Sequence, residues 1–90
     1  MTVKVYGREK GCVQCDATKR RLARDEIPFD FIDVNEDEKA FAYILGLGYQ
    51  QVPVVEVTQR REGPGTAVYS AWSGYRPGHI EGLIGERKAA

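Results

Sequence analysis

The two cysteines of this 90-residue chain stand three positions apart, in the segment Cys12-Val13-Gln14-Cys15. The alternating, β-branched segment 2–6 precedes them and predicts a strand, whereas residues 13–26 follow with helical spacing of apolar side chains. A Cys-x-x-Cys pair between a strand and a helix is typical of a redox site, because two thiols at this spacing can interconvert between dithiol and disulfide. The motif therefore favours a small α/β domain built around this junction.

The middle of the chain repeats the strand-then-helix pattern. Pro28 ends the first helix, because the residue before a proline avoids helical dihedral angles, and residues 29–34 predict a second strand. Asn35 is the expected N-cap of a second helix, since Glu38 follows three residues later as in a capping box. Glycines at positions 46 and 48 end that helix.

The last third of the chain predicts a hairpin and a final helix. Residues 52–57 and 67–72 are apolar and β-branched, and the turn sequence 62–65 lies between them. Pro77 suits the first position of the last helix. The apolar positions expected to share one face of each helix are Val13, Ala17, Leu22 and Ala23 in the first helix, Phe41, Ile44 and Leu45 in the second, and Ile80, Leu83 and Ile84 in the third.

This order of elements is βαβαββα. A right-handed β-α-β unit followed by a hairpin predicts a four-stranded mixed sheet with three helices distributed over both faces, which is the α/β arrangement of the thioredoxin-like fold. A chain of 90 residues has room for one core, so residues 1–90 are expected to form a single domain.

Composition excludes several classes of partner. The 13 basic residues balance the 13 acidic ones, so nothing suggests a nucleic-acid binder. No apolar stretch approaches the roughly 20 residues that span a bilayer, and the N-terminal segment lacks the apolar core of a signal peptide. We therefore expect a cytoplasmic protein, where thiols are kept reduced and a cysteine pair is more often catalytic than structural.

The position of the cysteines assigns them different roles. Cys12 is expected at the start of a helix, where free amide hydrogens and the positive helix end stabilise an anion and lower the pKa of a thiol. Arg8 and Lys10 add positive charge nearby. Cys12 is therefore the candidate nucleophile, and Cys15, one turn further, is the candidate resolving thiol.

Two other interpretations of the cysteines are weaker. A structural zinc site needs four ligands, and beyond the pair this chain offers one histidine, His79, so zinc would require dimerisation. Free cysteines are also often inert core residues, although the strand-to-helix context argues against this here. His79 itself is expected to be solvent-exposed or weakly bonded rather than catalytic, and no metal ligand is assigned.

Pro53 is the second informative residue. Before the third strand, a cis proline would hold the chain beside the cysteine pair and leave the backbone of Val52 free to pair with an extended substrate. The alternative is a trans proline at a strand start, where its missing amide hydrogen is harmless. The predicted fold favours the cis isomer.

Three segments together resemble the NrdH-redoxins, which are small glutaredoxin-like proteins with thioredoxin-like activity. They are Cys12-Val13-Gln14-Cys15, Gly48-Tyr49-Gln50-Gln51-Val52-Pro53-Val54-Val55 and Trp72-Ser73-Gly74-Tyr75-Arg76-Pro77. The resemblance covers nearly the whole chain, and the third segment is its most discriminating part. It implies that thioredoxin reductase, with NADPH behind it, is the electron donor, that no cofactor is bound, and that a class Ib ribonucleotide reductase is the client.

The resemblance also implies where a substrate binds. The expected substrate-binding residues are Val13, Gln14, Val52, Pro53, Trp72, Ser73, Gly74, Tyr75 and Arg76. The segment from Trp72 to Pro77 is expected to hold the last strand and the last helix together near the cysteines. Read from physics alone, Trp72 and Tyr75 are either core or partner-contact aromatics.

The chain departs from the family pattern at three places. The family commonly has Thr-Lys-Pro-x before the first cysteine, whereas here the loop 7–11 is one residue longer and lacks proline, with Arg8 as a substitute for the lysine. After Arg76-Pro77 the family often has an acidic residue, and here Gly78 and His79 follow. The hairpin insert from Thr58 to Thr66 is also longer than usual and is expected to lie away from the cysteines.

The leading hypothesis is a monomeric dithiol–disulfide oxidoreductase that reduces protein disulfides and supplies electrons for deoxyribonucleotide synthesis. The first alternative is a glutathione-dependent glutaredoxin, which commonly uses a Gly-Gly and Asp pattern before the last helix. This chain has no acidic residue there until Glu81, which weakens that alternative. The second alternative is a redox-inactive binding module that retains the fold.

Overall fold

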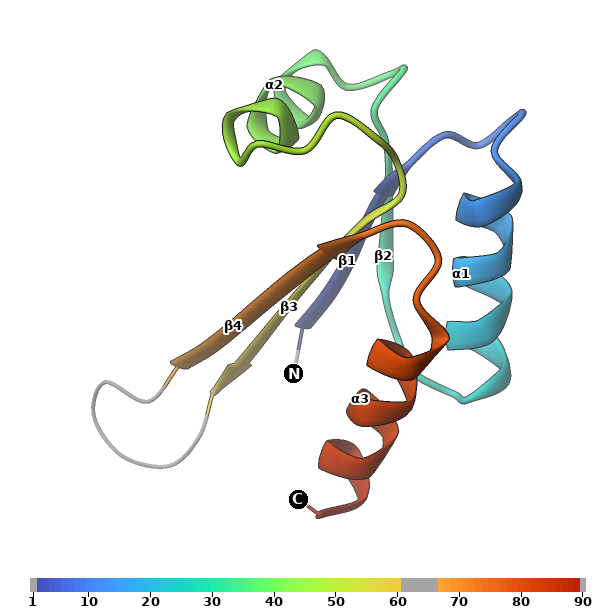
Figure 1. Cartoon of the computed structure of the whole chain (residues 1–90), viewed down its shortest axis with the longest axis vertical. Coiled ribbons are helices and arrows are strands. Elements are labelled where there is room, and N and C mark those ends of the chain that lie inside the picture. The colour runs from blue at the N-terminus through green and yellow to red at the C-terminus, as the bar shows by residue number, and fades with distance from the viewer. Residues whose placement is uncertain (1, 61–66, 90) are drawn as a thin grey trace.

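The computed structural model describes residues 2–60 and 67–89, and the side chains of residues 2–58 and 69–83. The elements follow the predicted order: β1 (Thr2–Gly7), α1 (Val13–Arg24), β2 (Asp30–Asp33), α2 (Glu38–Gly46), β3 (Val54–Arg60), β4 (Ala67–Ser73) and α3 (Pro77–Ala89). The strands form one sheet in the order β2-β1-β3-β4 (Figure 1). β1 runs parallel to β2 and antiparallel to β3, which pairs antiparallel with β4. The predicted thioredoxin-like mixed sheet with three helices is confirmed.

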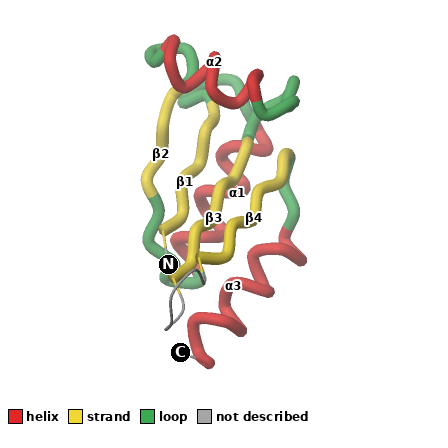
Figure 2. Tube along the Cα trace, turned by 90° about the vertical axis from the view of Figure 1, so that its left-hand side faces the viewer, coloured by secondary structure: helices red, strands yellow, loops and turns green. Residues whose placement is uncertain are grey.

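The helices divide between the two faces of the sheet. On one face, Leu22 of α1 and Ile80 and Leu83 of α3 share a buried apolar cluster with Val55 and Trp72. On the other face, side chains of α2 form a second cluster with residues of the first and third strands; its buried members are Tyr6, Val34, Ala40, Ile44 and Val54. Figure 2 shows α2 at one end of the sheet and α3 toward the other.

The central strand β3 is buried on both faces, as its apolar density predicts. Val54 and Val55 are fully buried, and Val57 is nearly so. Alternation along the strand sends Val55 and Val57 to the α1 and α3 side and Val54 to the α2 side. Glu56 is the exception in this strand, because it is a carboxylate that is only 8% exposed.

The first helix ends earlier than predicted, at Arg24 rather than at residue 26. Glu26 takes a positive φ of 57°, and its amide donates to the carbonyl of Ala23. The amide of Ile27 donates to the carbonyl of Leu22, and these two bonds form a Schellman closure. Ile27 and Leu22 also pack in the same core cluster, so the chain is turned back before Pro28 is reached.

The predicted apolar face of the first helix is partly wrong. The buried residues of α1 are Cys15, Thr18 and Leu22. Val13 is 81% exposed, Ala23 is exposed, and Ala17 is half-buried. The spacing of three and four residues that defines the buried stripe starts from Cys15, so Val13 lies outside it.

The N-cap of the second helix is Asp37 and not Asn35 as predicted. The Asp37 carboxylate accepts a hydrogen bond from the amide of Ala40 at 3.0 Å. Asn35 instead lies in a turn, where its amide donates to the Asp33 side chain at 2.9 Å. Glu36 and Asp37, which would be the first two helical residues after an Asn35 cap, therefore lie before the helix.

The strand ends also differ from the prediction. β2 is shorter than 29–34, and β3 starts at Val54 rather than at residue 52, because Pro53 has no amide hydrogen for the ladder. The predicted insert begins as a continuation of β3, since Thr58 pairs with Tyr69 and Arg60 with Ala67. Residues 61–66 of this insert lie outside the described residues.

The last helix begins at Pro77, as predicted. Ile80 and Leu83 face the core as expected, whereas the side chain of Ile84 lies outside the described residues. Among the described residues, no helix is long and apolar enough to cross a membrane.

Candidate active site

Cys12 and Cys15 form a disulfide, with their Cα atoms 5.2 Å apart. Cys12 is the N-cap of α1 and has an extended backbone conformation. Its Sγ accepts a hydrogen bond from the amide of Cys15 at 3.1 Å. In an N-cap position this sulfur faces the free amides and the positive end of the helix, so the site stabilises a thiolate at Cys12 once the disulfide is reduced.

The two sulfurs differ in exposure. Cys12 is partly exposed, whereas Cys15 is fully buried. The amide of Arg8 points at the Cys15 sulfur from 3.5 Å. An incoming disulfide can therefore reach Cys12, while Cys15 is accessible only to a partner already bonded to Cys12.

Gly7 lies against the inner sulfur, a contact that the sequence did not predict. Gly7 is the last residue of β1 rather than the first residue of the predicted loop 7–11. A β-carbon at this position would lie 2.9 Å from the Cys15 Sγ and 3.1 Å from the Phe31 ring. Only glycine fits here without displacing one of these groups.

The Val52–Pro53 peptide bond is cis, which confirms the predicted isomer. Pro53 is buried and immediately precedes β3. Its carbonyl accepts a hydrogen bond from the amide of Gly74 at 2.8 Å. The loop before β3 and the segment after β4 are therefore joined next to the cysteines.

Gln14 connects the cysteine motif to that same segment. Its Oε1 accepts a hydrogen bond from the amide of Tyr75 at 2.9 Å. Gly74 has a positive φ of 82°, and a β-carbon there would lie 3.2 Å from this same Gln14 oxygen. Glycine at position 74 therefore allows both the turn and the close approach of Gln14.

The segment from Trp72 to Pro77 joins β4 to α3, as the resemblance implies. Trp72 is 7% exposed and packs in the core with Ile80 and Leu83. Its ring stacks on His79, with 4.8 Å between centroids. The Arg76 guanidinium donates to the carbonyl of Ser73 at 3.2 Å.

The nine residues expected to bind substrate differ in exposure. Val13, Gln14, Tyr75 and Arg76 are exposed, Val52, Ser73 and Gly74 are half-buried, and Pro53 and Trp72 are buried. The exposed side chain of His79 agrees with the prediction, although it rests on Trp72. No cluster of three His, Cys, Asp or Glu side chains could hold a metal ion in the described part of the chain.

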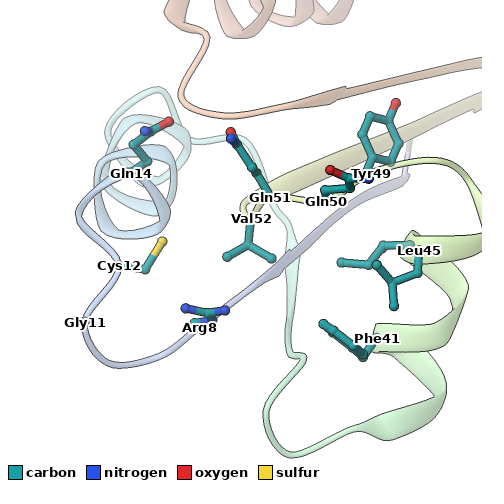
Figure 3. A pocket seen from close by; sticks show the side chains of 11 residues that line it. Arg8, Gly11, Cys12, Gln14, Phe41, Leu45, Tyr49, Gln50, Gln51 and Val52 are labelled. Atoms are coloured by element: carbon teal, nitrogen blue, oxygen red, sulfur yellow. The ribbon is translucent and has the colours of Figure 1, made fainter.

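A groove of about 480 Å³ lies beside Cys12. In Figure 3, Cys12, Arg8 and Gln14 lie on one side of this groove, and Phe41 and Leu45 lie opposite them. Its full lining is Arg8, Gly11, Cys12, Gln14, Phe41, Ile44, Leu45, Tyr49, Gln50, Gln51 and Val52. Its one charged member is Arg8, and its α2 wall is apolar.

The groove explains why two apolar residues of α2 are not in the core. Phe41 is 44% exposed and Leu45 is 45% exposed, although both were expected to share one apolar helix face with the buried Ile44. They lie one helical turn apart and point into the open groove (Figure 3). Phe41, Leu45 and Tyr49 are therefore candidate site residues that the sequence did not identify as such.

Comparison with known proteins gives the family. Residues 3–61 match the glutaredoxin family model. The chain is 34% identical over 83 residues to the glutaredoxin-like protein NrdH of Escherichia coli K12, covering 92% of this chain and 89% of the relative. It is 30% identical over 81 residues to NrdH of Lactococcus lactis subsp. lactis, covering 90% of this chain and 97% of the relative.

Solved structures agree with the sequence matches. The NrdH-redoxin of Escherichia coli, a glutaredoxin-like protein with a thioredoxin-like activity profile, superposes with a TM-score of 0.73 at 34% identity, covering 92% of this chain and 95% of that one. A glutaredoxin from Archaeoglobus fulgidus gives a TM-score of 0.67 at 25% identity, covering 91% and 84%. With its Cys12–Cys15 pair at a helix start, the chain belongs to the NrdH glutaredoxin-like proteins of the glutaredoxin family and is a thiol–disulfide oxidoreductase.

Proposed function

We propose that this protein is a dithiol electron carrier that reduces disulfides in other proteins. In the reduced protein, the Cys12 thiolate attacks one sulfur of the client disulfide, forming a Cys12–client disulfide and releasing the first client thiolate. The Cys15 thiol loses its proton and attacks the Cys12 sulfur, which closes the Cys12–Cys15 disulfide and releases the second client thiolate. The client gains two electrons, and the carrier leaves oxidised.

The observation that supports Cys12 as the attacking thiolate and Cys15 as the resolving thiol is the difference in position and exposure between the two sulfurs. The Cys12 Sγ is at the N-cap of α1 and partly exposed, whereas Cys15 is fully buried. A thiolate stabilised by a helix N-terminus is the better attacking group at neutral pH. Burial of Cys15 keeps it from reacting with anything except the mixed disulfide at Cys12.

Client docking is proposed along the groove beside Cys12. Val52 lies outside the β3 ladder, which begins at Val54, so its backbone groups can pair with an extended client segment. Phe41 and Leu45 offer an apolar wall for a client side chain, and Arg8 favours an acidic one. The groove thus suits a polypeptide around its disulfide.

The proposed electron donor is thioredoxin reductase, itself reduced by NADPH, rather than glutathione. A glutathione site needs groups that hold the charges of the tripeptide, and an acidic residue before the last helix commonly does so. In this chain the first acidic residue after β4 is Glu81, which already lies within α3. The thioredoxin-like activity profile of the Escherichia coli relative agrees with this choice. No cofactor of its own is needed, because the cysteine pair carries the electrons.

By the same family resemblance, the proposed client is the large subunit of a class Ib ribonucleotide reductase. The protein would supply it with electrons as a cytoplasmic monomer, without binding nucleic acid or membrane. The reducing cytosol suits a carrier that must spend part of each cycle as a dithiol.

A coupled assay tests the donor and the reaction together. Consumption of NADPH is followed with insulin as the protein disulfide, with either thioredoxin reductase or glutathione plus glutathione reductase as the donor system. We expect turnover with thioredoxin reductase and its loss in Cys12→Ser. Turnover with the glutathione system alone would instead make the protein a glutathione-dependent glutaredoxin, and no turnover with either donor would favour a binding module.

A further inference from the structure

A buried carboxylate joins three tyrosines on the face of the sheet that α2 covers. The Oε2 atom of Glu56 accepts hydrogen bonds from the hydroxyls of Tyr43 and Tyr69, the latter at 2.8 Å. The hydroxyl of Tyr6 donates to Oε1 at 3.5 Å. Because a buried charge is costly unless it is hydrogen-bonded, these hydroxyls are what make a carboxylate tolerable in this strand. The proposed reaction uses none of them.

The three hydrogen bonds connect Glu56 to different elements of the fold. Tyr6 and Tyr69 come from β1 and β4, and both strands are already joined to β3 by the sheet ladder. Tyr43 comes from α2, which has no ladder to hold it. The bond from Tyr43 to Glu56 is therefore the member of the cluster that ties a separate element to the sheet.

The other described contacts between the second helix and the sheet are apolar, and they include the ring of Tyr43, which lies against that of Tyr6 with 5.7 Å between centroids. Ala40 and Ile44 are its buried residues, and the whole element has nine residues. A helix of this length is marginal by itself, so its position depends on its contacts with the rest of the fold. Phe41 and Leu45 of this helix lie on the side of the groove opposite Cys12 (Figure 3), and Ile44 also lines the groove.

We propose that Tyr43 and Glu56 are positioning residues, whose hydrogen bond holds the α2 wall of the groove in place for a protein disulfide to dock beside Cys12. This inference rests on the docking mode of the proposed function. It assigns a role to a polar cluster that neither touches the cysteines nor lines the groove. A small disulfide that reacts with Cys12 without using the groove would not depend on this bond.

The electrostatics of the tyrosines agree with this distinction. The pKa of Tyr43 is raised, and the largest cause is its hydrogen bond to Glu56. Burial is instead the largest cause of the raised pKa values of Tyr6 and Tyr69. Tyr43 is 44% exposed, so the hydrogen bond to Glu56 raises its pKa more than burial does.

Two matched variants test the proposal, because Tyr43 of α2 and Tyr6 of β1 both donate to the carboxylate of Glu56. Tyr43→Phe removes the bond from α2, whereas Tyr6→Phe removes one from within the sheet. Tyr69→Phe would not separate the two, because the Tyr69 hydroxyl also forms a hydrogen bond with that of Tyr43. For insulin reduction, we expect Tyr43→Phe to raise KM by about tenfold or more with little change in kcat, because the lost hydrogen bond is to a charged group. Tyr6→Phe should leave KM unchanged, and both variants should reduce hydroxyethyl disulfide at the native rate.

Hydrogen exchange supplies a readout that does not require turnover. Exchange of the α2 backbone amides should be faster in Tyr43→Phe than in the native protein, and unchanged in Tyr6→Phe. Equal effects of the two variants on KM and on α2 exchange, or no effect of either, would overturn the proposal. If the native protein failed to reduce insulin, the proposed function would fail, and unchanged α2 exchange in Tyr43→Phe would separately reject the tether.

A double-mutant cycle assigns the effect to the pair. Glu56→Val removes the acceptor while keeping a side chain suited to a strand. If the bond from Tyr43 to Glu56 sets KM, Tyr43→Phe should raise KM no further in the Glu56→Val background. Independent, multiplying effects of the two substitutions on KM would contradict the assignment.

Discussion

Gly7 and the sulfur of Cys15 are in such close contact that a β-carbon at position 7 would lie 2.9 Å from that sulfur. Phe31 closes the other side at 3.1 Å. In the oxidised protein the Cys15 sulfur is fixed by its bond to Cys12 and cannot move aside easily. The inner half of the redox site is thus packed directly against the first strand.

Gly7→Ala should therefore destabilise the oxidised protein. We expect a loss of about 1–3 kcal/mol in the free energy of unfolding, as is usual when a methyl group is forced into a packed site. Denaturant unfolding of the oxidised form measures this loss. The matched control is Gly82→Ala, because a β-carbon there would meet nothing within 4 Å in α3.

The control should be stabilised by roughly 0.5–1 kcal/mol, since alanine replaces glycine within a helix. A Gly7→Ala protein as stable as Gly82→Ala would show that the space around the Cys15 sulfur is larger than the structure indicates.

Gln14→Met should loosen the segment that follows β4. The substitution removes the oxygen that accepts a hydrogen bond from the amide of Tyr75. A neutral hydrogen bond of this kind contributes about 0.5–1.5 kcal/mol, so exchange of the Tyr75 amide should accelerate about two- to tenfold. Gln14→Glu keeps an acceptor oxygen and should restore slow exchange. Equal protection in the two variants would mean that this bond does not hold the segment.

Alkaline pH should destabilise the fold through its tyrosines. Burial and the nearby Glu56 carboxylate raise the pKa of Tyr6 to about 12, from 10.0. Below about pH 10 the hydroxyl is protonated in both the folded and unfolded states, so its contribution to stability is fully present. Between pH 10 and about 12, the unfolded chain releases the proton and the folded one retains it. Stability should therefore fall across this window.

Tyr6 adds at most about 1.4 kcal/mol per pH unit to this fall. Tyr6→Phe removes this group, so the free energy of unfolding should depend less steeply on pH above 10. Denaturant unfolding of the oxidised form at several alkaline pH values measures the slope. An unchanged slope in Tyr6→Phe would mean that this hydroxyl is not held in its protonated form by the fold.

Cys15→Ser should trap the client. Without the resolving thiol, the mixed disulfide at Cys12 cannot be released from within the protein. We expect a covalent complex with the client that a reducing agent dissolves, and the client can be identified by mass spectrometry. Cys12→Ser is the matched control and should trap nothing, because Cys15 is buried. Trapping by Cys12→Ser instead would reverse the assigned roles.

Local signals in the sequence were enough for the order of elements. Apolar periodicity, turn residues and Pro77 each act within a few positions, and together they predict the sheet and its three helices. The strand-to-helix junction likewise predicts that Cys12 begins a helix. The cap of α2 was harder, because Asn35 and Asp37 are both good N-cap residues and the choice depends on the turn that Asp33 makes.

The features of the site that the sequence did not predict depend on which elements lie opposite one another in the fold. Phe41 and Leu45 have the spacing of a core stripe, but what faces them is an open groove rather than a packed strand. Gly7 carries no signal of the sulfur beside it, since the contact spans the turn into α1. Glu56 in an apolar strand does signal that partners exist, yet they come from positions as distant as 6 and 69.

The central claim is that Cys12, at the start of α1, is the reactive thiolate. The most direct test is the rate of alkylation of the fully reduced protein by iodoacetamide as a function of pH, with the modified cysteine identified by mass spectrometry. We predict that Cys12 reacts first, with an apparent pKa below the ~8.5 of an ordinary thiol, and that Cys15 stays protected. Preferential alkylation of Cys15, or a Cys12 pKa at or above the ordinary value, would contradict the account.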